Sequence, residues 1–258
     1  LEEYLYGVLR NEMSVDWPME ALKSQAVAAR TYAVYKAMQN QNRPYDLVDH
    51  EVDQVYNGFD TEHDRIRQAV DATRGEILIY QGEPVEAFYS SQSGDYTANS
   101  ENIWGNYVPY LRSVSSPFEA DAPYYRWEIS LTYEELAAHL NRDWRLKIGL
   151  IYDLEIRRSP QSRRVTHVWI HHSNGRETVL TGVEFKNLAR LPSTLFTVTR
   201  NEYGVTFAGS GRGHGLGLSQ WGARGYALNG YNYRAILQHY YPGVEIVKLR
   251  ETEILARR

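Results

Sequence analysis

A glycine-rich stretch, GRGHGLGLSQWG at residues 211–222, carries the side chains best suited to chemistry. It places His214, a Ser-Gln pair and Trp221 among five glycines. Glycine permits positive φ and lets a ligand approach the backbone, whereas ordering so flexible a segment is entropically unfavourable. The stretch lacks the Lys-Ser/Thr of a phosphate-binding loop and the strand–helix frame of a dinucleotide site. We therefore expect a ligand-binding surface; the alternative is a glycine-rich turn before a helix.

Glu12 is a candidate general acid. It falls at the end of a helix predicted over residues 2–13, where the negative end of the helix dipole disfavours a carboxylate. Met13 and Trp17 are near in sequence, and desolvation by such apolar groups raises a carboxyl pKa further. A glutamic acid that stays protonated near neutral pH can donate a proton in catalysis. The alternative is an exposed surface glutamate.

Arg30 lies among alanines on a helix predicted from Pro18 to about Met38. A buried arginine is unfavourable unless it is paired. It either orients a carboxylate, binds an acidic ligand, or forms a structural pair with Asp49 or Glu51. The residues alone favour the structural pair.

A serine-rich turn that includes Ser90 and Ser91 ends a predicted strand, a position that often lines a cleft. The Gly-x-Ser-x-Gly elbow is absent, so a serine nucleophile acting with His214 is disfavoured. His171 and His172 are neighbours on a strand, where adjacent side chains face opposite ways, so they are poorly placed to bind one metal.

Composition excludes several functions. The 258 residues contain no cysteine, which rules out disulfides and cysteine-based metal sites. His50 with Asp49 and Asp53 offers only a weak metal set, and we predict no metal and no cofactor. The net charge of −4 and the lack of a basic cluster argue against a nucleic-acid partner. Four arginines flank Ser159-Pro160 and are interpreted as a solvated hairpin tip: Arg157, Arg158, Arg163 and Arg164.

Periodicity and capping signals predict an alternation of helices and short strands. Helices are expected over 2–13, 18–38, 64–73, 132–141, 219–228 and 233–240, with a short one after Thr181; Thr132 with Glu135 and Thr181 with Glu184 are the caps. Strands are expected over 52–56, 76–80, 85–91, 127–131, 150–157, 164–171, 176–180, 196–200, 204–208 and 244–249.

These elements predict an α+β fold. We expect a mixed helix-and-sheet catalytic core built from both ends of the chain, residues 1–118 and 206–258. A smaller β-rich lobe, residues 119–205, is expected to be inserted, with the active-site cleft between the two.

Three blocks of sequence together resemble the stage II sporulation protein D family, whose domain is shared with an amidase-enhancer subgroup. They are YLYGVLRNEMSVDWPMEALKSQAVAARTYA (Tyr4–Ala33), QVYNG with AVDATRGEILIYQGEPVEAFYSSQSG, and GRGHGLGLSQWGARGYALNGYNYRAILQHYYPG. The blocks occur in family order over nearly the whole chain, whereas residues 119–205 carry no matching motif.

The resemblance implies a peptidoglycan lytic transglycosylase that acts on glycan strands stripped of stem peptides. The family's essential glutamate precedes a methionine in the first block and falls on Glu12. The matching blocks nominate further residues for binding the sugar: Gln25, Arg30, Tyr32, Ser90, Ser91, His214, Ser219 and Gln220, with Trp221 as a weaker candidate. Some members carry a zinc site with cysteines before the QVYNG match; this chain has none there, so no zinc is predicted.

The implied partners are peptidoglycan glycan strands, a cell-wall amidase and membrane-anchored sporulation proteins, in an extracytoplasmic, secreted or membrane-anchored setting. A second reading is a non-catalytic module that binds peptidoglycan and enhances an N-acetylmuramoyl-L-alanine amidase. A third is a plain hydrolase, in which water replaces the C6 hydroxyl of the sugar as the nucleophile.

Overall fold

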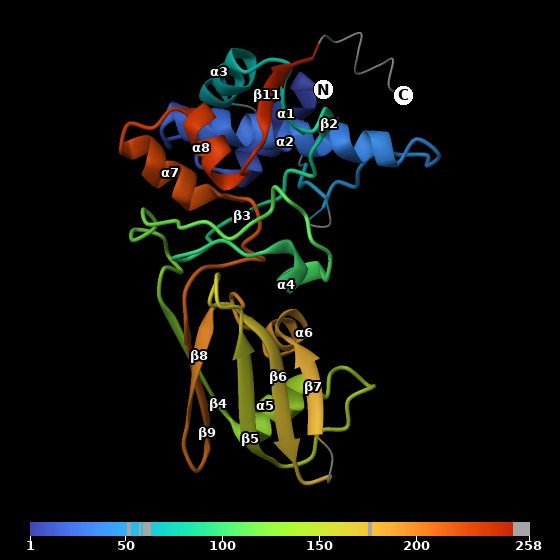
Figure 1. The fold of residues 1–258 in the computed structure, drawn as a ribbon, viewed down its shortest axis with the longest axis vertical. Coiled ribbons are helices and arrows are strands. Elements are labelled where there is room, and N and C mark those ends of the chain that lie inside the picture. Colours follow the sequence, from blue (N-terminus) through green and yellow to red (C-terminus); the bar gives the residue numbers. More distant parts are fainter. Residues whose placement is uncertain (51–52, 57, 59–62, 175–176, 250–258) are drawn as a thin grey trace. The chain divides into compact units, whose positions relative to one another are not determined.

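The computed structural model describes all residues except 51–52, 57, 59–62, 175–176 and 250–258. The chain forms two compact units, residues 1–89 with 217–258 (unit 1) and residues 90–216 (unit 2). Helices and small sheets are mixed throughout (Figure 1), which confirms the predicted α+β class.

Unit 1 combines both ends of the chain around one long helix. That helix, α2, contacts each of the other helices of the unit and strand β1. Its alanines are buried on several sides, because small side chains let the neighbouring helices approach closely. The helices are α1 (Glu2–Glu12), α2 (Met19–Gln39), α3 (Asp64–Ala72), α7 (Gln220–Leu228) and α8 (Tyr233–Tyr240).

The strands of unit 1 join segments that are far apart in sequence. One antiparallel sheet has the order β11-β1-β2, from Glu245–Lys248, Glu76–Tyr80 and Glu83–Pro84. In a second, two-stranded sheet, β3 (Tyr89–Ser90) pairs with β10 (Leu218–Ser219). The strand predicted over 85–91 is therefore wrong in its extent: β3 covers only Tyr89–Ser90, and the partner of β1 on this side is β2.

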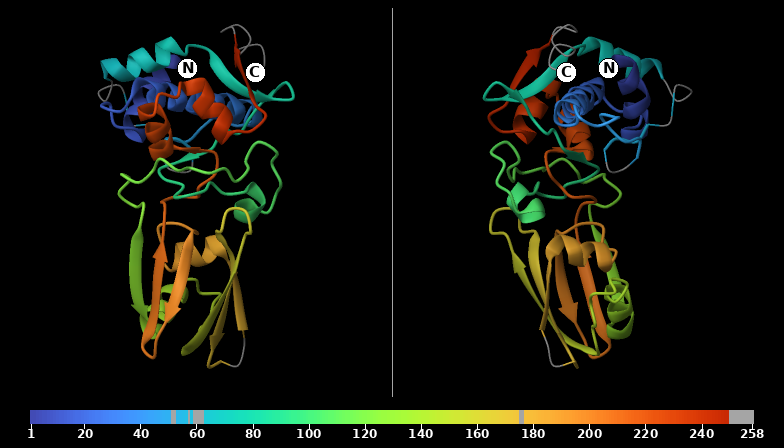
Figure 2. Two further views of the ribbon diagram at one scale, coloured as in Figure 1. Left: turned by 60° about the vertical axis from the view of Figure 1, so that its left-hand side comes forward. Right: turned by 90° about the vertical axis from the view of Figure 1, so that its right-hand side faces the viewer.

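Unit 2 is built on two three-stranded antiparallel sheets, shown side by side in Figure 2. Helices α5 and α6 contact strands of these sheets. In the shared core Phe185 stacks on Phe196, and Phe196 meets Phe207 edge to face. The first sheet is β4 (Trp127–Thr132), β9 (Gly204–Gly209) and β8 (Phe196–Arg200); the second is β5 (Ile151–Arg158), β6 (Val165–His172) and β7 (Glu177–Thr181); the helices are α4 (Ser100–Trp104), α5 (Tyr133–Leu140) and α6 (Gly182–Leu188).

The compact units divide the chain at different places from the predicted domains. The core was predicted to end at 118 and resume at 206, whereas unit 2 begins at Ser90 and ends at Leu216. Residues 90–118 pack with unit 2: Glu119 accepts hydrogen bonds from Ser93 (2.6 Å) and the Gly94 amide (3.0 Å). The two units are also nearly equal in length, whereas the inserted lobe was predicted to be smaller than the core.

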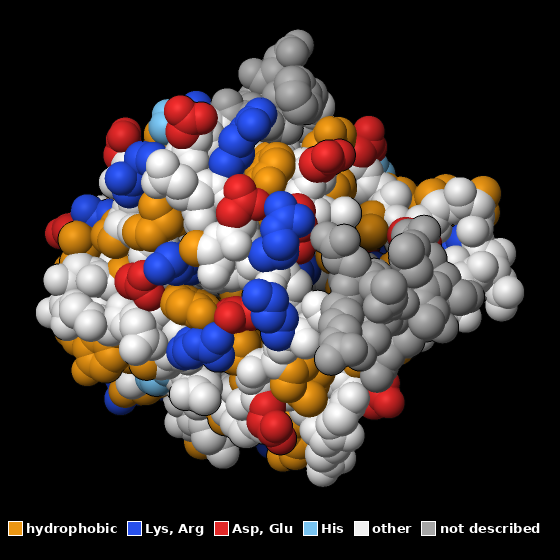
Figure 3. Space-filling view, turned by 90° about the horizontal axis from the view of Figure 1, so that it is seen from above, with side chains coloured by type: hydrophobic (Ala, Val, Ile, Leu, Met, Phe, Trp, Pro, Cys, Tyr) orange, Lys and Arg blue, Asp and Glu red, His pale blue; other side chains and the backbone are white. Residues whose placement is uncertain are grey.

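Three predictions involve residues outside those described: Glu51 as a partner of Arg30, residue 52 of a predicted strand, and residue 176 at the start of another. Residues 53–56 form no strand. Within the described ranges, no helix combines the length and the apolar character needed to cross a membrane. On the face shown in Figure 3, basic and acidic side chains are intermixed, in keeping with the mild net charge.

Gly217 permits the closest backbone approach in unit 1. Its φ is +63°, and a Cβ there would lie 2.0 Å from the Phe88 carbonyl oxygen. We expect Gly217→Ala to destabilise the protein by about 2–3 kcal/mol in chemical denaturation, from the positive φ and the clash together. Gly230→Ala is the matched control, because Gly230 has φ +83° but open space around a Cβ. Equal losses in the two variants would contradict the role given to the Phe88 contact.

Candidate functional site

Glu12 is the last residue of α1 and is half-buried in unit 1. Gln220, the first residue of α7, donates a hydrogen bond from Nε2 to Glu12 Oε2 at 2.7 Å. Residues from the two ends of the chain thus meet at one carboxyl group. Burial raises the pKa of Glu12, whereas hydrogen bonds from Gln220 and Tyr89 oppose that rise; the net shift is upward.

A relay of hydrogen bonds orients Tyr89 behind this carboxyl group. The amide of Gln54 donates to the Ala29 carbonyl (3.1 Å) and to the Tyr89 hydroxyl (3.0 Å), while its oxygen accepts from the Tyr4 hydroxyl (3.1 Å). Because Tyr89 accepts from Gln54, its own hydrogen is available for Glu12. Burial and the neighbouring Glu12 raise the pKa of Tyr89 well above its ordinary value, so Tyr89 stays a neutral donor.

Two tryptophans contact each other in unit 1: Trp17, five residues after Glu12, and Trp221, which follows Gln220. Trp17 and Trp221 meet edge to face with ring centroids 5.0 Å apart. Arg224 lies over the Trp221 ring at 5.2 Å. Aromatic faces of this kind suit the C–H faces of sugars as well as the burial of apolar surface.

The structure gives two of the nominated residues of unit 1 structural roles. Arg30 is fully buried and pairs with Glu2 at 2.6 Å, while it also donates to the carbonyls of Val70 and Glu76. This is the structural pair that the residues favoured, with a different partner, and the nomination of Arg30 for sugar binding is corrected. Ser219 is likewise buried and caps α7, accepting from the Gly222 amide at 3.2 Å.

Gln25 and Tyr32 are both buried on α2. The Tyr32 hydroxyl donates to Asp53 at 2.8 Å, and its ring meets Phe88 edge to face. The Gln25 amide has no hydrogen-bond partner among the described residues, although both its polar atoms are buried. A buried amide without a partner is unfavourable, so Gln25 remains a predicted ligand contact.

Ser90, Ser91 and His214 belong to unit 2. Ser90 is buried, and its hydroxyl has no hydrogen-bond partner in the part of the chain that is described. His214 accepts from the Leu216 amide at Nδ1 (3.0 Å), which leaves the proton of a neutral ring on Nε2, and its ring lies 5.9 Å from that of Trp104. The binding roles of these three residues stay predictions.

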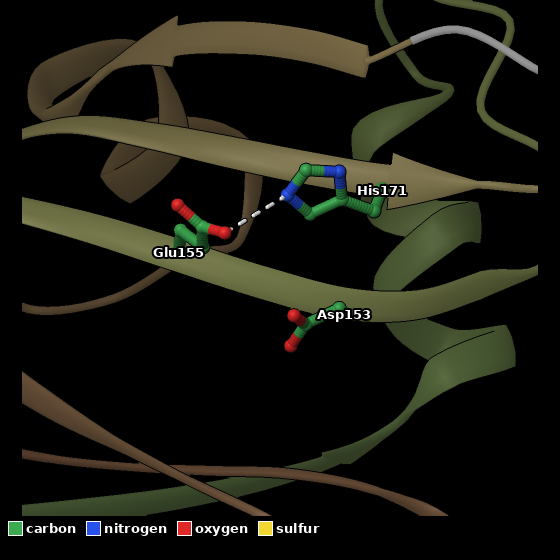
Figure 4. A group of neighbouring side chains, drawn as sticks. All are labelled: Asp153, Glu155 and His171. Carbon is green, nitrogen blue, oxygen red and sulfur yellow. Dashed lines mark ion pairs between the residues drawn. The ribbon is translucent and has the colours of Figure 1, made fainter.

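One group of metal-ligating side chains occurs in the described residues, on β5 and β6 (Figure 4). His171 lies 3.6 Å from Glu155, but Asp153 is already paired with Arg200, and a guanidinium beside the ligand set opposes a bound cation. His172 faces the other way and is buried, with Nε2 3.1 Å from Thr178.

Asp53 directly precedes the QVYNG match. Asp53 accepts from Tyr32 and from the Val48 amide and lies 3.6 Å from Lys36, so its oxygens have other partners.

The upward pKa shift of Glu12 predicts a pH-dependent gain in stability when its charge is removed. A raised native pKa favours the protonated folded state, so the contribution of Glu12 is fully present below its unfolded pKa and is lost as pH rises through the native value. We expect Glu12→Gln to match the wild-type free energy of unfolding at pH 4 and to exceed it at pH 8. Denaturation at both pH values measures this, and a variant that is less stable at pH 8 contradicts it.

Comparison with known proteins identifies the family. The sequence profile described as Stage II sporulation protein matches residues 1–80, and a domain of unknown function matches residues 108–217. The chain is 36% identical over 263 residues to stage II sporulation protein D of Bacillus amyloliquefaciens, covering 95% of this chain and 74% of that protein. The chain therefore belongs to the stage II sporulation protein D family, which confirms the resemblance of the three blocks.

Two further relatives extend this comparison. An uncharacterised protein of Brachyspira hyodysenteriae is 39% identical over 251 residues; the alignment covers 96% of this chain and 66% of that protein. The amidase enhancer of Bacillus subtilis is 30% identical over 297 residues, and the match covers 94% of this chain but 40% of that protein.

Sequence reasoning missed Tyr4, Gln54 and Tyr89 as members of the site. All three lie inside the blocks that carried the resemblance, which was the available signal. Their roles depend on hydrogen bonds between residues far apart in sequence, such as Tyr4 and Gln54, which are 50 positions apart, so local patterns could not assign them.

Proposed function

We propose that this protein is a peptidoglycan lytic transglycosylase that cleaves the bond between N-acetylmuramic acid and N-acetylglucosamine in strands without stem peptides. One observation carries the proposal. Glu12 is a partly buried carboxyl group with a raised pKa. The uncharged side chains of Gln220 and Tyr89 donate hydrogen bonds to it. Membership of the family and the names of its relatives support a role at the cell wall.

Glu12 acts first as an acid. It protonates the glycosidic oxygen, and positive charge develops at C1 of the muramic residue as the bond breaks. Burial favours the protonated form that this step requires. Gln220 and Tyr89 then stabilise the carboxylate as it forms, because hydrogen bonds to a charged oxygen are stronger than those to a neutral one.

Glu12 acts second as a base. Its carboxylate takes the proton of the C6 hydroxyl, whose oxygen attacks C1 and closes a 1,6-anhydro ring. The attack is intramolecular, so it needs neither water nor a second carboxylate.

The alternative is a non-catalytic module that binds peptidoglycan and stimulates an amidase. The name of the Bacillus subtilis relative, an amidase enhancer, favours it. In either case we place the protein outside the cytoplasm, at the cell envelope, with a wall amidase and membrane-anchored sporulation proteins as partners.

Product analysis separates these functions. Purified protein is incubated with peptide-free glycan strands, and the products are analysed by mass spectrometry. We expect 1,6-anhydro-muramic ends. Reducing ends would instead show a hydrolase, and intact strands together with stimulation of an added amidase would show the enhancer.

A further inference from the structure

A basic pocket in unit 2 lies outside the Glu12 network. It has a volume of about 490 Å³, and Lys186, Arg190 and Arg212 all line it. No aspartate or glutamate is among its described lining residues. Another pocket of this unit, of about 830 Å³, differs because Asp95 and Glu128 accompany its arginines. The smaller pocket therefore has an uncompensated positive charge.

None of these three cations forms an ion pair with an acidic side chain among the described residues. Among the described residues, the guanidinium groups of Arg190 and Arg212 make no hydrogen bond or ion pair, and Lys186 donates only to the amide oxygen of Asn187 at 3.0 Å. Burial and then the charge of Arg212 lower the pKa of Lys186. Neighbouring like charges are unfavourable, and an anionic ligand would relieve that repulsion.

The backbone holds Arg212 and an aromatic ring together. Gln92 exchanges two backbone hydrogen bonds with Arg212, and its side chain accepts from the Tyr124 amide at 2.9 Å. The Arg212 guanidinium lies 4.6 Å from the centre of the Tyr124 ring. This stacking fixes the plane of the guanidinium and leaves its N–H edges available for a carboxylate.

Arg190 occupies a backbone position that suits glycine. After α6 its φ is +58°, its amide donates to Asn187 O (3.3 Å), and the Leu191 amide donates to Lys186 O (2.9 Å). This is the helix-ending motif in which glycine is the usual residue at the left-handed position. A helix C-terminus attracts cations, which accounts for Lys186 and Arg190 in part, but Arg212 comes from a separate segment. An arginine at this left-handed position is less favourable than a glycine would be.

We propose that this pocket is a subsite for the free lactyl carboxylate of a muramic acid residue in a peptide-free glycan strand. The inference rests on the proposed function, because it names the chemical group by which that substrate is selected. When a stem peptide is attached, the lactyl carboxylate is an amide and has no charge. The pocket would therefore distinguish stripped strands from unstripped ones.

The test measures binding without cleavage. In a Glu12→Gln background, dissociation constants are determined by calorimetry for peptide-free strands and for the same strands with their carboxyl groups reduced to alcohols. Arg190→Gly and Arg212→Gln are each expected to weaken binding of the unreduced strands by about tenfold or more, as expected for the loss of a charged hydrogen bond. Both should leave binding of the reduced strands unchanged.

Two controls test whether a loss of affinity is specific to the pocket. Arg157→Gln removes the same charge from an exposed position of unit 2 outside the pocket and should leave the affinity within about twofold of its parent. Arg190→Gly should melt no lower than its parent, because glycine is preferred at that position.

Equal affinity for reduced and unreduced strands overturns the inference, as does an equal loss in Arg157→Gln, or a lower melting temperature for Arg190→Gly with unchanged affinity. Failure of the proposed function is separate: it would appear as absent cleavage by the protein that retains Glu12, whatever the pocket variants bind.

Discussion

Glu12→Gln is expected to lower the rate of 1,6-anhydro product formation from peptide-free strands by about 10²–10⁴-fold, the usual effect of losing a general acid and base. Glutamine keeps the size of the side chain and can still accept from Gln220, so binding of the strand should persist. The loss should therefore fall on kcat, with little change in KM.

The matched control for this variant is Glu3→Gln, an exposed glutamate on the same helix. It should retain full activity. If Glu12→Gln kept more than a tenth of wild-type cleavage, the single-carboxyl mechanism would be wrong. If neither Glu12→Gln nor its control Glu3→Gln cleaves the strands, but both variants stimulate an amidase equally, the enhancer function is the correct one.

Glu2→Gln is expected to have the largest effect on stability. Glu2 holds Arg30 through a 2.6 Å ion pair, and Arg30 is fully buried. Removing one partner leaves a buried charge uncompensated, which destabilises a protein by about 3–5 kcal/mol. Urea denaturation of Glu2→Gln measures the loss.

Glu3→Gln, one position along the same helix, should change the free energy of unfolding by about 0.5 kcal/mol or less. The double variant Glu2→Leu with Arg30→Met should recover most of the stability lost in Glu2→Gln, because replacing both charges by apolar groups removes the unpaired one. No recovery would show that the other hydrogen bonds of Arg30, to Val70 and Glu76, matter more than the ion pair.

Local signals predicted most helices, although not α4, and most strands. Thr132 with Glu135 and Thr181 with Glu184 form the two expected capping boxes, because a capping box depends on residues three apart. The strands expected over 150–157, 164–171 and 176–180 are also present, as β5, β6 and β7, and they pair in sequence order.

Contacts between distant segments could not be predicted in this way. Arg164 was interpreted as part of a solvated hairpin tip, but it is fully buried and donates to the carbonyls of Ser93 (2.6 Å) and Tyr96 (3.1 Å). In the candidate site, the raised pKa of Glu12 was predicted from its position at the end of a helix. Its contact with Gln220, 208 residues away, could not be predicted from the local sequence.

The pairing of β3 with β10 has an evolutionary consequence. The Leu218 amide donates to the Phe88 carbonyl at 3.1 Å, so the polypeptide leaves unit 1 and returns to it at neighbouring positions. A segment with adjacent ends can be exchanged or can diverge without disturbing the scaffold that receives it. Relatives that share the helices around Glu12 are therefore free to vary residues 90–216 without changing those helices.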